Sequence, residues 1–595
     1  MQRHHTNIIS KVYHSRFFPL LVFVLVGLLV LSKVIWNHSL ILGHDSLFHF
    51  NRFVDAEEQL RTGKFSYFQM NFGFNQTGRI VNALYGPFVA YISGALLLIS
   101  PNWYIFELID VMVVMLVAAF GMYWLCKVNQ VSRGYALIVA SMYMIGSSVI
   151  SWVNTQQFTG VGAAVIPYLF VAIALTLRRL KVPVIGLSIA MAILVQTHMI
   201  TSMMGFLALV PIFTVALVKT EDKLKMVVSS FGAALITLAL TANVWGALLS
   251  IFTNNHLIPA FSTVDMSNYG FIFNLYSFEM IIKPMELIVF IYVIAYVLIK
   301  WRSLDYIIKT YALVGGFFLW VSTNLFPWKI LQSLIPELST YLQFPKRFAV
   351  LAFVLLFVSF GMILTNDHDA LTLKWLHFEG PDYRYAFIFL LMATMIGTNI
   401  WVLNFKIATV DSMRQSNDFQ IPIEHTVSHV NRNKRTYYED FYGSNKKALV
   451  DDLSKVVPDY LPATQKVNYK NYNDYHPYSN AYQQLDKQNY RIKGGFKKTV
   501  NKDGSLTITW NNRHKKARNY QIPVVAYAST ELTLNGKTVI PVSQTPVGAV
   551  VIKANPGKNS LNVSYHIGWA MKALFILTIV SWIVVSGIVI IRIWL

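Results

Sequence analysis

Long apolar segments separated by short charged ones dominate the chain. The first runs from Phe17 to Trp36 and follows a basic stretch that contains Lys11 and Arg16. A helix needs roughly 20 mainly apolar residues to cross a bilayer, so this segment predicts an uncleaved anchor with a cytoplasmic N-terminus. Eleven further segments have a similar character: 104–125, 134–152, 160–178, 184–200, 203–218, 226–247, 285–300, 306–326, 347–365, 385–403 and 570–592. The pattern predicts a polytopic helical membrane protein.

Segment 84–99 is shorter and contains a Gly-Pro pair. If it does not cross the membrane alone, the basic clusters around Lys127, Arg178, Lys219 and Lys300 all lie in cytoplasmic loops, as the positive-inside rule favours. If it crosses alone, all of them lie outside. We therefore expect 84–99 to be a re-entrant helix, a surface helix or half of an unresolved pair, within a total of twelve to fourteen spans.

This topology places four less hydrophobic stretches on the outer face: 37–83, 248–284, 327–346 and 404–569. The last one is long enough for an independent domain. The sequence thus predicts a membrane domain over 1–403 with a first outer loop at 37–83, an outer domain over 404–569 and a final membrane helix over 570–595.

The predicted outer domain divides in two by composition. Residues 404–487 are polar and rich in tyrosine, whereas 488–567 contain short alternating runs separated by turn residues. Alternation of this kind is typical of half-buried strands, and it predicts a small antiparallel β-sandwich. Asp503-Gly504 and Asn535-Gly536 are candidates for type I′ hairpin turns, and Gly494-Gly495 marks a further break.

Composition narrows the class of protein. With 55% hydrophobic and 13% charged residues, the chain is not a single soluble globule. Its 50 Lys+Arg and 29 Asp+Glu give a net charge of +21, which favours an anionic neighbour such as lipid headgroups, a phosphorylated substrate or an acidic polymer. So much apolar sequence argues against nucleic acid. Cys126 is the lone cysteine, so an intrachain disulfide or a cysteine-built metal site is excluded.

The first outer loop carries a concentrated group of polar side chains. If the segment after Asp45 is helical, Asp45, His49 and Arg52 lie on one face at i, i+4 and i+7, with His44 directly before them. A carboxylate beside imidazoles and a guanidinium suits a general base or a cation ligand. The alternative is that Asp45 caps the helix and the other side chains form a solvated face.

Three other places carry candidate chemistry. Lys346 and Arg347 follow Pro345 at the expected start of a helix, which suits a phosphate or an anchor at lipid headgroups. His198, near the outer end of a span, either reaches a substrate or bonds to a neighbouring helix.

Glu107 and Asp110 share a helix face near the outer end of another span, where they either have a function or are simply solvated. The polar residues Asn154, Gln156 and Gln157 predict an outer turn. The sequence contains no Walker loop, no His-Glu-x-x-His and no Gly-x-Ser-x-Gly motif, so nucleotide hydrolysis has no support.

Four features together resemble a known family. They are Gly43-His44-Asp45 after the first span, Tyr85-Gly86-Pro87, the run from Gln343 to Phe348, and an outer β-domain followed by a terminal helix. In their order and placement the chain resembles the YfhO-like bacterial membrane proteins of the GT-C glycosyltransferase superfamily.

The resemblance implies an inverting transferase on the outer face of the bacterial cytoplasmic membrane. Its donor would be a polyprenyl-phosphate sugar and its acceptor an envelope polymer, such as teichoic or lipoteichoic acid. It implies that Asp45 acts on the acceptor hydroxyl, while Lys346 and Arg347 neutralise the departing phosphate. His44, His49 and Arg52 would position substrate or contact phosphate, with His198 as a further substrate contact.

His44 stands where some family members carry a second acidic residue, which leaves dependence on a divalent cation open. No other cofactor is implied. Two other functions also remain open: a transporter or flippase of lipid-linked saccharides, and a non-catalytic factor for envelope assembly. A flippase should display polar residues on both sides of the bundle core.

Overall fold

The computed structural model describes residues 11–260, 262–271, 282–367, 370–371, 381–415, 426–428, 434–463 and 495–594. Part of the predicted tyrosine-rich segment and one predicted break lie outside the described residues: Tyr469, Tyr472, Tyr475, Tyr478, Tyr482 and Gly494.

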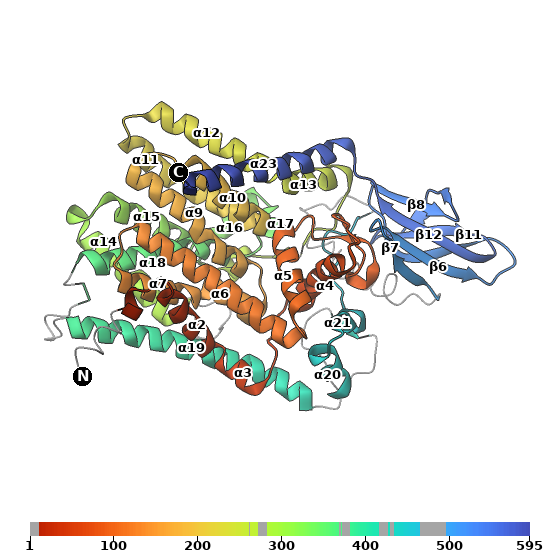
Figure 1. Ribbon diagram of the computed structural model, residues 1–595, viewed down its shortest axis with the longest axis horizontal. Coiled ribbons are helices and arrows are strands. Elements are labelled where there is room, and N and C mark those ends of the chain that lie inside the picture. The colour runs from red at the N-terminus through yellow and green to blue at the C-terminus, as the bar shows by residue number, and fades with distance from the viewer. Residues whose placement is uncertain are drawn as a thin grey trace.

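The protein is a polytopic helical bundle from which a β-domain projects at one end (Figure 1). Eight helical segments of the described chain are long and apolar enough to cross a membrane, and five shorter apolar helices accompany them. The bundle helices are α2 (Phe18–Val30), α3 (Ser32–Asn37), α6 (Trp103–Val128), α7 (Arg133–Met144), α8 (Ser147–Thr155), α9 (Thr159–Arg179), α10 (Val184–Thr197), α11 (Met199–Lys219), α12 (Lys223–Leu240), α13 (Ala242–Asn254), α14 (Pro284–Ile299), α15 (Tyr306–Val321), α18 (Ala349–Asn366), α19 (Pro381–Gln415) and α23 (Trp569–Trp594).

Every predicted span coincides with one or two of these helices, and the break between α7 and α8 has a tertiary cause. The predicted span 134–152 is divided into α7 and α8. The carboxylate of Glu286, from α14, accepts hydrogen bonds from the Ser147 backbone N–H at 2.7 Å and from its hydroxyl at 2.6 Å. A neighbouring helix thus satisfies the exposed N-terminus of α8. The sequence predicts that the membrane domain ends at residue 403, where the apolar pattern ends. Helix α19 continues beyond that residue, to Gln415.

Helix α5 (Pro87–Ile99) corresponds to the doubtful segment 84–99. Its 13 residues rise about 20 Å, less than the roughly 30 Å of a hydrocarbon core. It packs against α4 (Ser46–Thr62) (Figure 1). Gly94 makes this approach close, since a Cβ there would lie 2.9 Å from the Glu57 backbone nitrogen. Helix α5 is therefore too short to cross a bilayer alone.

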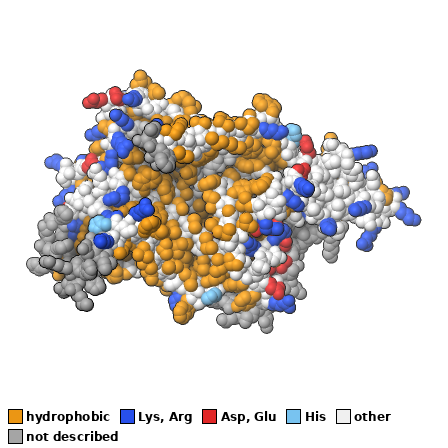
Figure 2. Space-filling view, viewed as in Figure 1, with side chains coloured by type: hydrophobic (Ala, Val, Ile, Leu, Met, Phe, Trp, Pro, Cys, Tyr) orange, Lys and Arg blue, Asp and Glu red, His pale blue; other side chains and the backbone are white. Residues whose placement is uncertain are grey.

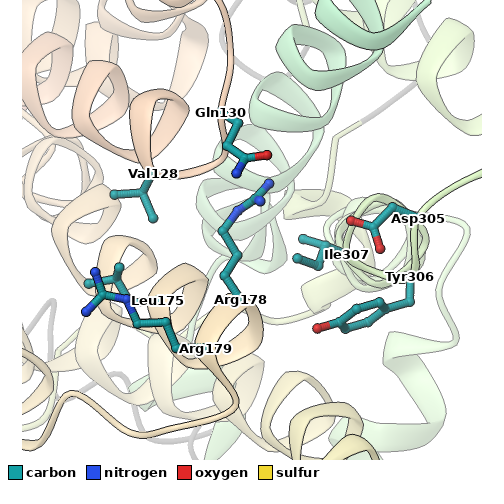
Figure 3. A pocket seen from close by; sticks show the side chains of 8 residues that line it. All are labelled: Val128, Gln130, Leu175, Arg178, Arg179, Asp305, Tyr306 and Ile307. Carbon is teal, nitrogen blue, oxygen red and sulfur yellow. The ribbon is translucent and has the colours of Figure 1, made fainter.

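The basic clusters predicted to share one face do lie together, at the end of the bundle away from the β-domain. One cavity of about 520 Å³ is lined by Val128, Gln130, Leu175, Arg178, Arg179 and residues 305–307 (Figure 3). Lys219 adds its ammonium group 5.1 Å from the Tyr306 ring centroid. We call this the basic end, and the opposite one the β-domain end.

Helix α4 lies at the β-domain end, between the rest of the bundle and the sandwich (Figure 1). Its residues 46–59 are all buried. The idea that its polar side chains form a solvated face is therefore wrong. Helices α5 and α6 and the segment α21 (Lys446–Asp452) pack around it, so its polar groups bond to protein: Asp55 Oδ1 accepts from the Phe72 N–H at 2.9 Å.

The predicted β-sandwich is confirmed. One sheet has the order β5-β6-β12-β8-β9 and the other β10-β11-β7, and all pairings are antiparallel. Leu506, Ile508, Ile522 and Val524 belong to the core between them. The strands are β5 (Lys497–Val500), β6 (Leu506–Asn512), β7 (Arg518–Val525), β8 (Thr530–Leu534), β9 (Lys537–Thr538), β10 (Ser543–Gln544), β11 (Ala549–Ala554) and β12 (Gly557–Tyr565).

One of the two predicted hairpin turns is confirmed. Asn535 and Gly536 both have positive φ, 49° and 82°, as a type I′ turn requires. The prediction for Asp503-Gly504 is wrong, because only Gly504 has a positive φ. Instead, Asp503 Oδ1 accepts from the Ser505 N–H at 3.0 Å and from its hydroxyl at 2.7 Å, which forms an Asx turn within a longer connection.

Candidate functional site

Asp45 lies where the less hydrophobic stretches of the chain converge. It occupies the position before the first residue of α4, but its side chain caps no backbone N–H. Its carboxylate is half-buried. Burial raises the pKa of Asp45, while the positive groups of Lys455, His44 and Arg347 oppose that rise. The capping alternative therefore fails, and the carboxylate interacts electrostatically with Lys455 and Arg347 as well as with the adjacent His44.

Two of these cations come from distant segments. Lys455, in the short strand β4 (Leu453–Lys455), is buried and donates to the His44 carbonyl at 3.2 Å. Arg347 belongs to the 3-10 helix η4 (Pro345–Phe348), which leads into α18. Its guanidinium donates to the Leu342 carbonyl at 2.6 Å and to Gln343 Oε1 at 3.1 Å. These bonds fix its direction beside Asp45.

The remaining predicted cations and imidazoles have different surroundings. His44 is exposed and Lys346 is half-buried, with the Lys346 ammonium 5.6 Å from the Phe344 ring centroid. His198 is buried, and its Nδ1 lies 2.7 Å from the Thr201 hydroxyl. It interacts electrostatically with Arg347, so it belongs to the same cluster as Asp45.

His49 and Arg52 form a buried layer behind Asp45. The Arg52 guanidinium lies 3.0 Å from His49 Nδ1, and it donates to Asn82 Oδ1 at 3.0 Å and to the Tyr85 and Gly86 carbonyls. Burial lowers the pKa of His49 well below its ordinary value, so the ring is neutral and Nδ1 accepts from Arg52. Both side chains therefore direct their hydrogen bonds to the protein.

Tyr85 connects the buried layer to Asp45. The Arg52 guanidinium carbon lies 4.9 Å from the Tyr85 ring centroid, and the phenol interacts electrostatically with Arg347 and Asp45. Burial raises the pKa of Tyr85 to about 12. Its hydroxyl is therefore protonated at neutral pH and can donate a hydrogen bond.

Gln156 holds the turn that carries Asp45. The sequence predicts only that Gln156 belongs to an outer turn, but the Gln156 side chain is buried. Gln156 Oε1 accepts from the Gly43 N–H and from the Ser46 hydroxyl, both at 2.7 Å, and Nε2 donates to the Ile41 carbonyl at 3.1 Å. A Cβ at Gly43 would overlap the Gln156 side-chain oxygen. A single amide thus fixes residues 41–46.

Glu107 and Asp110 support this arrangement from α6. Glu107 Oε2 accepts from the Ile41 N–H at 2.9 Å. Asp110 accepts from the Ser93 hydroxyl and from Trp152 Nε1, each at 2.9 Å. Both carboxylates are buried, so the expectation of simple solvation is wrong. They anchor α5, α8 and the turn before α4 to the bundle.

The donor set around Asp45 does not match a metal site. Among the described residues, no three His, Cys, Asp or Glu side chains converge as ligands. The groups that act on Asp45 are Lys455, His44 and Arg347, whereas a hard divalent cation prefers several oxygen ligands.

Sequence reasoning missed Lys455 and the nearby Tyr460, which interacts electrostatically with Tyr85, Arg347 and Arg52. Both lie in a polar segment with many similar residues, and no spacing distinguishes them. Long-range contacts bring this segment to the site. They include the antiparallel bridge between Leu257 and Pro462, the bond from the Ile258 N–H to the Leu461 carbonyl at 2.7 Å, and the bond from the Arg79 guanidinium to the Asp459 carbonyl at 2.6 Å.

No protein-family model and no curated protein matches the sequence. Solved structures align with part of it, among them the following two. The arabinofuranosyltransferase AftD from Mycobacteria has 11% sequence identity and a TM-score of 0.38, over 69% of this chain and 28% of its own. The oligosaccharyltransferase of Archaeoglobus fulgidus, tethered to an acceptor peptide, has 13% identity and a TM-score of 0.39, over 68% and 58%. The chain spans less than two thirds of either protein, and its function has to be argued from the site.

Proposed function

We propose that this protein is a membrane glycosyltransferase of the GT-C type, related to the YfhO-like proteins. The observation that carries the proposal is the half-buried Asp45 carboxylate, which caps no helix and faces Arg347 and Lys455. A base beside fixed cations suits a reaction in which a hydroxyl loses a proton while an anionic group departs.

In this reaction the acceptor hydroxyl attacks the anomeric carbon of a polyprenyl-phosphate sugar. The new bond joins that carbon to the acceptor oxygen, and the bond to the phosphate oxygen breaks with inversion. Asp45 takes the hydroxyl proton. Arg347 stabilises the charge that develops on the leaving phosphate, with Lys346 as a second cation, and the Tyr85 hydroxyl donates to an oxygen of the substrate. His49 and Arg52 hold the Tyr85 and Gly86 backbone in place.

The proposed location of the site, on the outer side of the membrane, follows from the difference in charge between the two ends of the bundle. Clusters of Lys and Arg mark the cytoplasmic side of membrane proteins, so the basic end would face the cytoplasm and Asp45 the outside. A lipid-linked donor carries its own activation energy, which suits a site without a phosphate-binding loop. The proposed acceptor is an anionic envelope polymer of a bacterium.

The apolar character of helix α18 favours transfer over lipid-linked sugar transport. Helix α18 is buried along Ala349–Leu364, and Ser359 is its only polar residue in that range. A flippase needs polar groups along its path through the core. An assay in sealed vesicles separates the two functions, because a transferase consumes the donor from one leaflet without moving it to the other.

Mass spectrometry of envelope polymers tests the proposal directly. A deletion strain should lack one sugar mass, and the wild-type gene should restore it. Polymers of unchanged mass in the deletion strain would contradict the transferase. Loss of the polymer backbone itself would instead favour an assembly factor.

The pH dependence of transfer is expected to follow the protonation state of Asp45. Only the deprotonated carboxylate is a base, and burial raises its pKa, so activity should fall as the pH drops through a value above that of an ordinary carboxyl. Lys455→Met removes a charge that lowers this pKa, and it should move the acid limb of the pH–rate profile to higher pH. An unchanged limb would contradict the role of Lys455.

Gln156→Leu tests the support of the catalytic turn. The variant keeps the approximate size of the side chain, but it leaves the Ser46 hydroxyl without its acceptor and the Gly43 N–H with only the Ser46 hydroxyl oxygen as acceptor. This should cost roughly 1–3 kcal/mol of stability. We expect kcat to fall about 10-fold to 100-fold through misplacement of Asp45, with KM nearly unchanged. The control is Gln157→Ala, at the next, half-buried position. Equal kcat values in the two variants would contradict a positioning role.

A further inference from the structure

Charge is segregated within the β-sandwich. Residues 495–568 contain 10 Lys+Arg and only 2 Asp+Glu. The two acids lie toward the bundle: Asp503 precedes β6, next to Gly504, whose carbonyl accepts from Asn71 Nδ2 at 2.7 Å, and Glu531 lies near the start of β8, 3.1 Å from His566. Neither neutralises the opposite end of the sandwich.

The opposite end is basic throughout. Strands β6 and β8 run away from the bundle, and β7 and β12 return to it, so the β6–β7 and β11–β12 connections lie together at the free end (Figure 1). Figure 2 shows Lys and Arg side chains there on the face in view. Six exposed cations belong to this surface, which we call the basic tip: Arg513, Lys515, Lys516, Arg518, Lys553 and Lys558.

The sheet register fixes the positions of three of these residues. Arg518 pairs with Ala554 and Asn519 with Lys553, while Lys558 pairs with Asn511 on the other sheet. Neighbouring strands lie about 4.8 Å apart and alternate residues about 7 Å apart. Arg513, Lys515 and Lys516 lie in the connection between β6 and β7. Separate positive charges are thus distributed over the free end of the sandwich, which suits a ligand that also carries several negative charges.

We propose that the basic tip binds an extended polymer that carries repeated anionic groups. The tip points away from the membrane-spanning bundle (Figure 1), so lipid headgroups of the same membrane are out of reach. Residues 511–519 and 553–559 contain no Phe, Tyr or Trp, whereas protein interfaces are enriched in aromatic side chains and depleted of Lys. An anionic polymer needs neither a pocket nor an apolar contact.

The tip is separate from the Asp45 cluster, so its function does not depend on the proposed chemistry. It would hold a long acceptor near the membrane and raise its local concentration at the site. Binding can be measured without any transfer, and the two proposals can fail independently.

The experiment compares full-length proteins in neutral lipid nanodiscs. One variant replaces Arg513, Lys515, Lys516 and Lys553 by Gln. The matched control neutralises four exposed cations at the basic end: Lys223, Lys225, Lys300 and Arg302. The probe is a fluorescent poly(glycerol phosphate) chain, with a neutral glucan of equal length and vesicles of phosphatidylglycerol as comparisons, and thermal unfolding confirms that each variant folds.

We expect the tip variant to bind the phosphate polymer about 10-fold or more weakly, and the control to bind as the wild type does. Wild-type affinity should decrease with salt, because exposed charges are screened. Equal loss in both variants, equal binding of the neutral glucan, or tighter binding to the vesicles than to the polymer would overturn the proposal.

Discussion

Asp45→Asn is expected to reduce sugar transfer by about 10²-fold to 10⁴-fold, the usual contribution of a general base. The amide keeps the size of the side chain but cannot take the acceptor proton. Because the Asp45 side chain caps no backbone N–H, the substitution removes no helix cap, and the protein should fold and accumulate normally. Donor and acceptor should still bind, so the loss should appear in kcat.

The measurement is incorporation of labelled sugar by purified protein with a polyprenyl-phosphate donor. Asp451→Asn provides the control, because this carboxylate is exposed and pairs with Lys447 at 2.7 Å, and exposed pairs contribute little. Normal transfer by the Asp45 variant would remove Asp45 from the mechanism. Loss of transfer in both variants would indicate a general defect of the outer segments instead.

The sequence predicts the membrane helices well because their signal is local. Apolar runs of sufficient length must be helical in a bilayer, where each backbone polar group needs an internal partner. The breaks between α7 and α8 and between α12 and α13 are not visible in the same pattern. The first depends on Glu286, which lies 139 residues from Ser147, and no local rule anticipates such a cap.

The candidate site was predicted only in part, for the same reason. Helical spacing places Asp45, His49 and Arg52 on one face. It does not indicate which part of the protein each side chain contacts. Since α4 is buried on all sides, His49 and Arg52 bond to the protein while Asp45 remains half-buried. The approach of Arg347 and Lys455 to Asp45 joins segments about 300 and 400 residues away, which only tertiary packing determines.

Arg347→Gln is expected to reduce kcat by about 10²-fold to 10³-fold, the range found when one fixed group that stabilises transition-state charge is removed. The guanidinium is oriented by the Leu342 carbonyl and by Gln343, and it acts on Asp45 and Tyr85. A preoriented cation stabilises the leaving phosphate without first reorganising. Loss of Arg347 should also raise the pKa of Asp45, so the acid limb should move to higher pH.

The comparison with two other variants distinguishes charge from structure. Arg347→Lys keeps the charge but not the planar fork of donors, so it should recover part of the lost rate. Lys329→Gln is the control, because the Lys329 side chain is 75% exposed and pairs with Asp265. If Arg347→Gln retains full activity, Arg347 does not act on the phosphate. If Arg347→Lys is as inactive as the Gln variant and both unfold at a lower temperature, Arg347 holds the Leu342–Gln343 turn rather than the phosphate. A shifted acid limb together with partial rescue by Lys supports a direct electrostatic role, because a purely structural defect would change neither the pH dependence nor the response to charge.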